Sequence, residues 1–145
     1  MKISDILRHK PEHSGADVVT IAPTAVVREM LALLAEHRIG ALIVADGDTV
    51  AGIVSERDVV RRLNDQGAAL LDTPVAQIMT TSVYSCSSGD DIDSIANTMT
   101  ERRIRHMPVI DDGELVGLIS IGDVVSSRMR QLEQDRGQLE QYITG

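Results

Sequence analysis

Apolar residues recur at helical spacing in two stretches of this chain that resemble each other. Between Thr24 and Arg38 they return every three or four positions, and residues 90–103 repeat the pattern. The two apolar stripes are Val27, Met30, Leu31 and Leu34, and Ile92, Ile95, Ala96 and Met99. This spacing predicts two amphipathic helices, the first with Thr24 as its N-cap.

Each predicted helix is followed by two short apolar runs around an Asp-Gly pair. The runs are residues 41–45 and 49–54, and residues 107–110 and 115–119. Asp-Gly between apolar runs indicates a β-hairpin, because both residues tolerate the positive φ angles of the turn. Short leading strands at 18–21 and 83–86, and second helices over 56–64 and from Ile121, complete the order strand, helix, strand, strand, helix.

The two stretches are copies of one unit. The segment GIVSERDVV at Gly52–Val60 matches GLISIGDVV at Gly117–Val125, 65 residues later. We therefore expect a first unit over 1–72, a second over 73–128 and a helical extension over 129–145. Residues 10–17 are a polar insertion in the first unit, and residues 65–74 are a polar connector. A unit of this size is too small to bury a core comfortably by itself.

Both copies place a Ser-x-x-Asp motif directly after the third predicted strand, at Ser55–Asp58 and Ser120–Asp123. One interpretation is a capping box, in which serine and aspartate satisfy backbone N–H groups of the first helical turn. The other is an anion site, because such a helix start presents backbone donors and a positive dipole. The sequence leaves both open.

Composition narrows the possible partners. The chain has 145 residues and a net charge of −8, so its field repels nucleic acid and anionic lipid. It has no Phe or Trp and only Tyr84 and Tyr142, so a flat ligand would rest on aliphatic side chains. Cys86 is the single cysteine, which excludes an intrachain disulfide and favours the cytoplasm. No apolar run approaches the roughly 20 residues that span a bilayer.

Several other sites are excluded or weak. The sequence contains no P-loop, no dinucleotide-binding glycine motif and no G-x-S-x-G nucleophile turn. His9 and His13 have a metal-like spacing, but Pro11 separates them and no third ligand is evident. We expect no metal, no obligatory cofactor and no enzymatic activity.

The tandem units with G-h-h-S-x-x-D at Gly52–Asp58 and Gly117–Asp123, where h is hydrophobic, resemble the cystathionine β-synthase (CBS) domain pair, or Bateman module. The segment RRIRHMPVI at 102–110 also looks like that family's second strand. The resemblance covers Ile3 to about Arg128 and is greatest to small stand-alone bacterial proteins. It implies an α/β fold of two β-α-β-β-α units with pseudo-two-fold symmetry.

The resemblance further implies binding of AMP, ADP, ATP, NAD or S-adenosylmethionine in clefts between the two units. Asp58 and Asp123 would hold ribose, Ser55 and Ser120 would meet phosphate, and the first strands would border adenine. The candidate binding residues are Thr20, Ile21, Ser55, Glu56, Arg57, Asp58, Ser85, Cys86, Ile104, Arg105, His106, Met107, Pro108, Ser120 and Asp123.

The two copies are not equivalent, because Arg105 and His106 stand where the first copy has Gly40 and Ala41. We expect these two basic residues to reach phosphate in the cleft of Asp58, which would bind the more highly charged ligand. The chain is thus expected to be an adenine-nucleotide sensor that forms a homodimer, through the helical stripe after Met129, and signals to an unknown protein. The alternative is a ligand-independent scaffold whose Ser-x-x-Asp motifs only cap helices.

Overall fold

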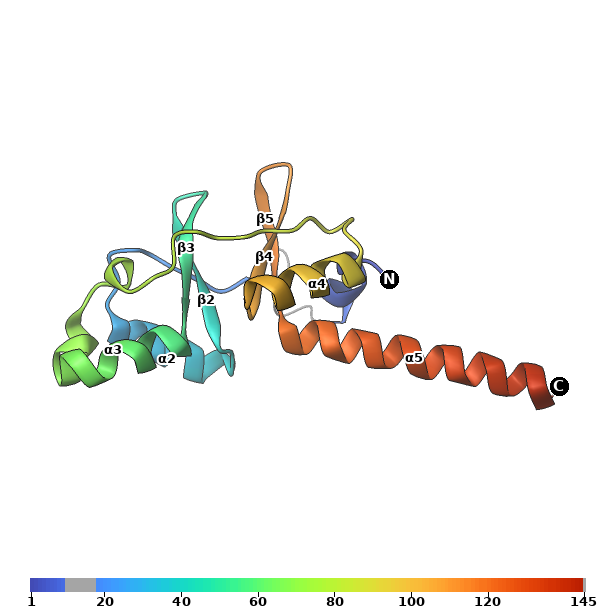
Figure 1. Ribbon diagram of the computed structural model, residues 1–145. Helices are drawn as coiled ribbons and strands as arrows, with labels where there is room; N and C mark the ends of the chain where they lie inside the picture. Colours follow the sequence, from blue (N-terminus) through green and yellow to red (C-terminus); the bar gives the residue numbers. More distant parts are fainter. Residues whose placement is uncertain (10–17, 145) are drawn as a thin grey trace. The chain divides into compact units, whose positions relative to one another are not determined.

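The computed structural model describes residues 1–9 and 18–144 and confirms a mixed α/β fold (Figure 1). Its elements are α1 (Ile3–Arg8), β1 (Thr20–Ile21), α2 (Val27–His37), β2 (Ala41–Asp46), β3 (Thr49–Ser55), α3 (Glu56–Gln66), the 3₁₀ helices η3 (Gly67–Asp72) and η4 (Val75–Gln77), α4 (Ile92–Arg102), β4 (His106–Asp111), β5 (Glu114–Ser120) and α5 (Ile121–Thr144). The chain forms two compact units, Val18–Tyr84 and α1 together with residues 85–144.

The unit Val18–Tyr84 is built on a three-stranded sheet. β2 pairs in parallel with β1 and antiparallel with β3. The first four residues of β2, Ala41 to Val44, are all buried, and so the strand reads as a continuous apolar run. Apolar residues of α2, η3 and η4 share the same core, which contains Ile21, Val27, Met30, Leu34, Leu42, Val44, Val54, Leu70, Val75 and Ile78.

The second unit repeats this plan with one fewer strand. β4 and β5 form an antiparallel hairpin, and the equivalent of β1 is reduced to a single parallel bridge between Cys86 and Val109. The core is again entirely aliphatic and sulfur-containing: Ile3, Ile6, Cys86, Ile92, Ile95, Met99, Met107, Val109, Ile119 and Val124. The absence of Phe and Trp is therefore met by packing branched side chains and methionines in both units.

Backbone details recur 65 residues apart. Arg38 and Arg103 end α2 and α4 with left-handed φ angles of 54° and 55°. β2 and β4 each carry a register shift, at Val44/Ala45 and Val109/Ile110. A positive φ in a non-glycine residue is uncommon, and its repetition supports the duplication more strongly than the sequence match alone.

The segment at the start of each copy packs against the other copy. In the compact unit Val18–Tyr84, the backbone N–H groups of Val75 and Ala76 donate to the carbonyls of Ala25 and Pro23, at 2.8 and 3.1 Å. In the second, Ile3 and Ser4 donate to Asp90 and Ser88, both at 2.9 Å. These pairs correspond position by position. Each compact unit therefore contains the leading segment of the other sequence copy. Val75 and Ala76 belong to the unit Val18–Tyr84, and Ile3 and Ser4 belong to the unit that includes residues 85–144.

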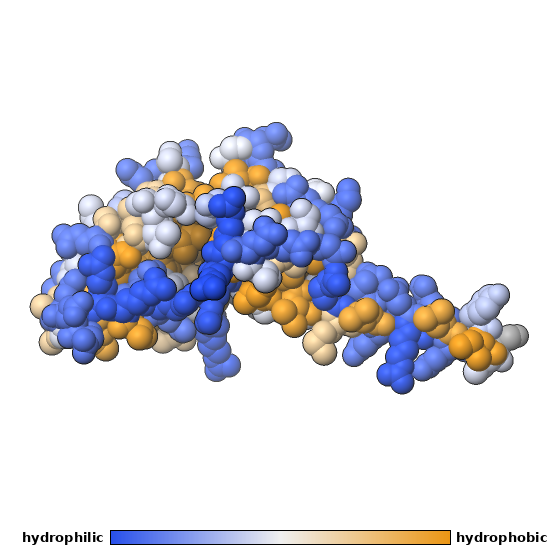
Figure 2. All heavy atoms as spheres, viewed as in Figure 1, coloured by the Kyte–Doolittle hydropathy of each residue, from blue (hydrophilic) through white to orange (hydrophobic). Residues whose placement is uncertain are grey.

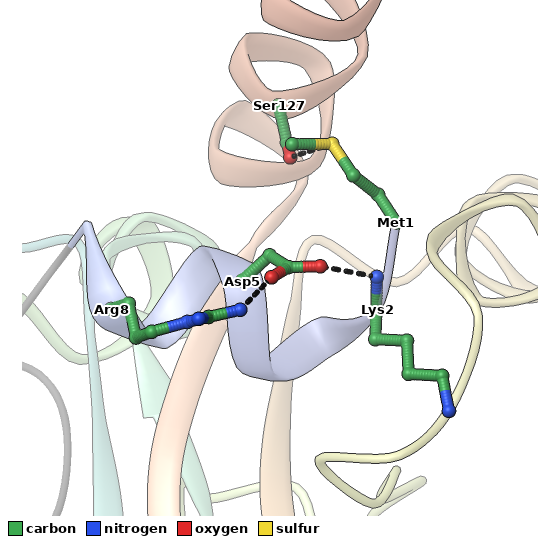
Figure 3. Close-up of polar contacts among 5 residues, drawn as sticks. All are labelled: Met1, Lys2, Asp5, Arg8 and Ser127. Atoms are coloured by element: carbon green, nitrogen blue, oxygen red, sulfur yellow. Dashed lines mark hydrogen bonds and ion pairs between the residues drawn. The ribbon is translucent and has the colours of Figure 1, made fainter.

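Helix α1 is held against α5 by further contacts (Figure 3). The Ser127 hydroxyl lies 3.3 Å from the Met1 sulfur, and the backbone N–H of Lys2 donates to Asp5 at 2.8 Å. Ile3 and Ile6 of this short helix are buried in the same core as Val124 of α5. Six residues do not form a stable helix alone, so tertiary packing maintains α1.

Several predicted boundaries are wrong. The strands expected at 18–21 and 83–86 shorten to Thr20–Ile21 and the bridge at Cys86. Thr24 is not the N-cap of α2, which is Val26. The connector is not simply polar, because it contains η3 with Leu70 fully buried. The insertion at 10–17 lies outside the described residues.

Candidate functional site

The Ser-x-x-Asp motif of the first copy closes the start of α3. The backbone N–H of Ser55 donates to Asp58 Oδ2 at 2.8 Å, and the Ser55 hydroxyl oxygen lies 3.2 Å from the same atom. Ser55 is the N-cap in extended conformation, with φ −136° and ψ 170°. The carboxylate at the third helical position also complements the helix dipole.

The second copy makes the same closure at α5. The backbone N–H of Ser120 donates to Asp123 Oδ2 at 2.7 Å, and the Asp123 N–H donates to Ser120 Oγ at 3.1 Å. The capping interpretation is therefore confirmed in both copies.

The hairpins bring the strand before each motif to the helix start. Ala41 lies opposite Ser55, and Glu56 N–H donates to the Gly40 carbonyl at 3.1 Å. At the equivalent place His106 lies opposite Ser120, and Ile121 N–H donates to the Arg105 carbonyl at 2.8 Å. Each helix start is thus hydrogen-bonded to the strand across from it.

Within their own unit, the backbones of Arg105 and His106 lie beside Ser120. The assignment of their side chains to the cleft of Asp58 stays a prediction. Arg105 is exposed and His106 is half-buried. The hairpin register, counted back from the Asp-Gly turn, would have shown this neighbourhood.

The candidates expected on the leading strands differ in their burial. Ile21 is buried, and its neighbour Thr20 is exposed. Ser85 is exposed, whereas Cys86 is buried, its N–H bonded to the Pro108 carbonyl at 3.0 Å. Burial is the main cause that raises the pKa of the Cys86 thiol to about 12. Cys86 therefore serves as a core residue and not as a thiolate nucleophile.

The remaining candidates separate into exposed and buried groups. Glu56 and Arg57 are exposed at the first turn of α3, and Asp58 and Asp123 are half-buried. Met107 and Pro108 are buried, and Ile104 is half-buried. Each copy therefore combines exposed or half-buried polar candidates with buried apolar ones. We call these two arrangements half-sites: Thr20, Ile21, Ser55, Glu56, Arg57 and Asp58 in one, and Ser85, Cys86, Ile104, Arg105, His106, Met107, Pro108, Ser120 and Asp123 in the other.

One polar contact of the second half-site was not predicted. Ser88 donates to Asp111 twice, from its N–H at 2.9 Å and from its hydroxyl at 2.5 Å. These bonds hold the pKa of Asp111 below its ordinary value. The first copy has Pro23 at the position of Ser88, which has neither donor. The contact fixes the loop after Cys86 to the end of β4 in one copy only.

Within residues 1–9 and 18–144, no three His, Cys, Asp or Glu side chains are grouped so that they could hold a metal ion. His13 of the considered histidine pair lies outside those ranges. In the same described part of the chain, no helix has the length and apolar character needed to cross a membrane.

This arrangement is similar to those of known proteins. The family model described as CBS domain matches residues 3–65 and 75–130. The CBS domain-containing protein CBSX3, mitochondrial, of Arabidopsis thaliana is 30% identical to this chain. The alignment covers 99% of this chain and 72% of the length of CBSX3. The crystal structure of ATU1752 from Agrobacterium tumefaciens, a CBS-domain containing protein, aligns with 41% identity and a TM-score of 0.82, covering 88% of this chain and 99% of its own.

A more distant structure matches in fold. The CBS domain pair of protein MJ0100, solved in complex with 5′-methylthioadenosine and S-adenosyl-L-methionine, aligns with a TM-score of 0.75 at 22% identity. The alignment covers 92% of this chain and 98% of that one.

Proposed function

Because this chain belongs to the CBS-domain family, we propose that it binds adenosine-containing ligands at its Ser-x-x-Asp helix starts and regulates a partner protein according to their occupancy. The observation that carries the proposal is the duplicated helix start, where a capped N-terminus and a half-buried aspartate coincide. The MJ0100 pair, which has the same fold, was solved with two adenosine compounds.

The chemistry of each half-site matches the parts of such a ligand. Asp58 and Asp123 would accept hydrogen bonds from the 2′- and 3′-hydroxyls of ribose, because a carboxylate offers about four acceptor positions. Serine hydroxyls and backbone N–H groups at the helix starts would receive phosphate or another anionic group. Adenine would rest against Ile21 in one half-site and against Cys86 and Pro108 in the other, since no ring is available for stacking.

The two half-sites would differ in the charge they accept. Arg105 and His106 add a guanidinium and an imidazole to the half-site of Ser120, where the other copy has Gly40 and Ala41. Arg57 at the first half-site corresponds to Gly122. We therefore propose that the two copies prefer different ligands. The more highly charged ligands would bind where Arg57, Arg105 and His106 contribute their side chains.

A thermal-shift and calorimetric series tests the proposal. AMP, ATP, NAD and S-adenosylmethionine are compared with ribose 5-phosphate, which lacks the base, and with 2′,3′-dideoxy-AMP, which lacks the diol. A ligand at a hundred times its dissociation constant stabilises the folded state by about 2.7 kcal/mol. We expect AMP or ATP to raise the melting temperature and the dideoxy compound to bind at least tenfold more weakly. No shift with any adenosine compound would refute the proposal.

We propose that the ligand is bound and not consumed. Incubation of the protein with ATP or AMP, followed by chromatography, should recover the nucleotide unchanged. The proposal also includes assembly into a homodimer and a cytoplasmic location, the latter as expected from the single cysteine.

A second candidate is a ligand-independent scaffold. The reciprocal capping bonds favour it, because they already give serine and aspartate a structural role in both copies. The same ligand series separates the two functions. A scaffold would retain its partner in co-purification whether or not nucleotide is present, whereas a sensor would gain or lose the partner on addition of AMP or ATP.

A further inference from the structure

Helix α5 exposes an apolar stripe that its own unit does not cover. Val124 and Ser127 are its buried residues, both within the first two turns. Val125, Met129, Leu132, Leu139 and Ile143 are 50 to 80% exposed. Figure 1 shows the last turns of α5 extending away from the other elements of its unit, and Figure 2 shows apolar groups along that extension. Residues 131–144 lie beyond the CBS family match.

The stripe has the spacing of a two-stranded coiled coil. Successive positions 125, 129, 132, 136, 139 and 143 alternate by four and three residues, which makes them the d and a positions of consecutive heptads. Five of the six positions are apolar, and the sixth is Arg136 at an a position. Among the described residues of this extension none is buried, and an isolated helix of about 14 residues is marginal in water, so a partner helix would stabilise it.

We propose that the α5 stripe pairs with the α5 stripe of a second copy of this chain, in parallel and in register. The inference deepens the proposed homodimer by naming its interface, and it is independent of nucleotide binding. Its occupant is a second copy because one stripe with a single heptad phase is complementary to itself.

Charge at the flanking positions selects the parallel orientation. In a parallel pair, Arg136 at the a position neighbours Asp135 at the g position of the facing helix, and it already contacts Glu140 on its own helix at 3.2 Å. The two Arg136 side chains face each other across the seam, and each lies between two carboxylates that offset the repulsion of the guanidiniums. An antiparallel pair that covered the whole stripe would set Asp135 against Asp135 and Glu133 against Glu133 near its centre.

The test begins with analytical ultracentrifugation of the full chain. We expect the wild type to sediment as a dimer of the 15.7 kDa chain, and the double variant Leu132→Glu/Leu139→Glu to raise the dimer dissociation constant at least tenfold. The matched control is Gln134→Glu/Gln141→Glu, which adds the same charges on the opposite face of α5. A monomeric wild type would overturn both this inference and the proposed homodimer. A dimer that survives the leucine substitutions would overturn only this inference.

Single introduced cysteines decide the orientation, on a chain whose own Cys86 is buried. Leu139→Cys places a thiol at a d position, and a parallel in-register pair should oxidise it to a covalent dimer in high yield. Gln141→Cys, on the outer face, should cross-link poorly. Equal yields from the two variants, or cross-linking only when Met129→Cys is combined with Leu139→Cys, would overturn the parallel arrangement. Circular dichroism confirms that each variant is folded.

Discussion

His106 in β4 lies directly opposite Ser120 in β5, and at the equivalent register position of the other copy Ala41 lies opposite Ser55. The backbone is the same in both places, including the hydrogen bond from the first helical N–H to the preceding strand. The two copies therefore share the backbone arrangement of the half-site and differ in the side chains that it carries. Differences in ligand binding between the copies should follow from those side chains.

Replacing the two basic residues by those of the other copy tests that difference. We expect Arg105→Gly/His106→Ala to weaken ATP binding by about tenfold to a hundredfold, because a hydrogen bond to a charged group contributes about 1.5–3 kcal/mol. Binding of uncharged adenosine should change little. Calorimetric titration measures both.

The control is Arg61→Ala, which removes a positive charge from the exposed face of α3. Equal losses for ATP in the control would assign the effect to the general field of the molecule. Equal losses for ATP and adenosine in the double variant would assign it to altered folding of β4.

The capping aspartates should contribute to stability independently of ligand. Asp58→Ala removes the acceptor for the Ser55 N–H, and Asp123→Ala removes that for Ser120. Each loss should cost about 1 kcal/mol and lower the melting temperature by roughly 2–4 °C. Asp65→Ala, in the last turn of α3, is the control and should be neutral. Unchanged stability in both capping variants would mean that these carboxylates do not stabilise the fold and contribute only to ligand binding.

Much of this architecture follows from sequence periodicity. The amphipathic spacing gave the two long helices within two or three residues, and the Asp-Gly pairs gave both hairpins. The 65-residue offset also carried over to backbone detail, since Arg38 and Arg103 adopt the same left-handed conformation. These features are local, and local propensity determines them.

The features that sequence missed depend on tertiary contacts. The edge strand at 83–86 reduces to one bridge at Cys86, because the loop after it is tied instead to Asp111 through Ser88. Periodicity could not predict the exchange of leading segments. An apolar pattern indicates that a segment is buried, but it does not indicate which copy the segment packs against. The half-site neighbours of Arg105 likewise emerge only from the strand register.

Gly52 should be intolerant of any side chain. A Cβ built there would lie 2.7 Å from the Thr80 carbonyl oxygen and 2.9 Å from the Met79 sulfur. Thr80 is held at this place by two backbone hydrogen bonds with Ile53, at 2.8 and 3.0 Å. Gly52→Ala should therefore destabilise the protein by about 1–3 kcal/mol, measured by urea unfolding.

Gly137→Ala is the matched control for the same change in α5. A Cβ at Gly137 meets nothing within 4 Å, and alanine exceeds glycine in helix propensity by about 1 kcal/mol. This variant should raise helicity and stability. A Gly52→Ala variant as stable as wild type would show that the Thr80 segment moves aside without cost.

The Ser88 and Asp111 contact should make stability depend on acid pH. The pKa of Asp111 is lowered in the folded state, first by the Ser88 hydroxyl and then by its N–H. An unfolded aspartate titrates near 3.9, so the stabilisation is present above that pH and is lost as pH falls through the lower folded pKa.

Urea unfolding of wild type and Ser88→Ala between pH 2 and 7 measures this dependence. The two stability curves should differ most at neutral pH and converge at the acid end of this range, because the Asp111 side chain is then protonated and the serine hydroxyl has no carboxylate to bind. Ser94→Ala, on the exposed face of α4, should run parallel to wild type. A constant difference between wild type and Ser88→Ala at all pH values would remove the ionised carboxylate from the explanation.

The Cys86 thiol should resist modification in the folded protein. Burial, with the nearby carboxylates of Asp90 and Asp111, raises its pKa from 9.0 to about 12. Because the thiolate is the reactive species, that shift lowers its population at pH 8 by about a thousandfold, and burial restricts access further. We expect Ellman's reagent to label wild type slowly in buffer and at once in urea. The Gln134→Cys variant supplies an exposed thiol in the same molecule and should show one rapid and one slow equivalent. Two rapid equivalents would mean that the loop containing Ser85 and Cys86 opens readily, and this part of the half-site would then have to form on ligand binding.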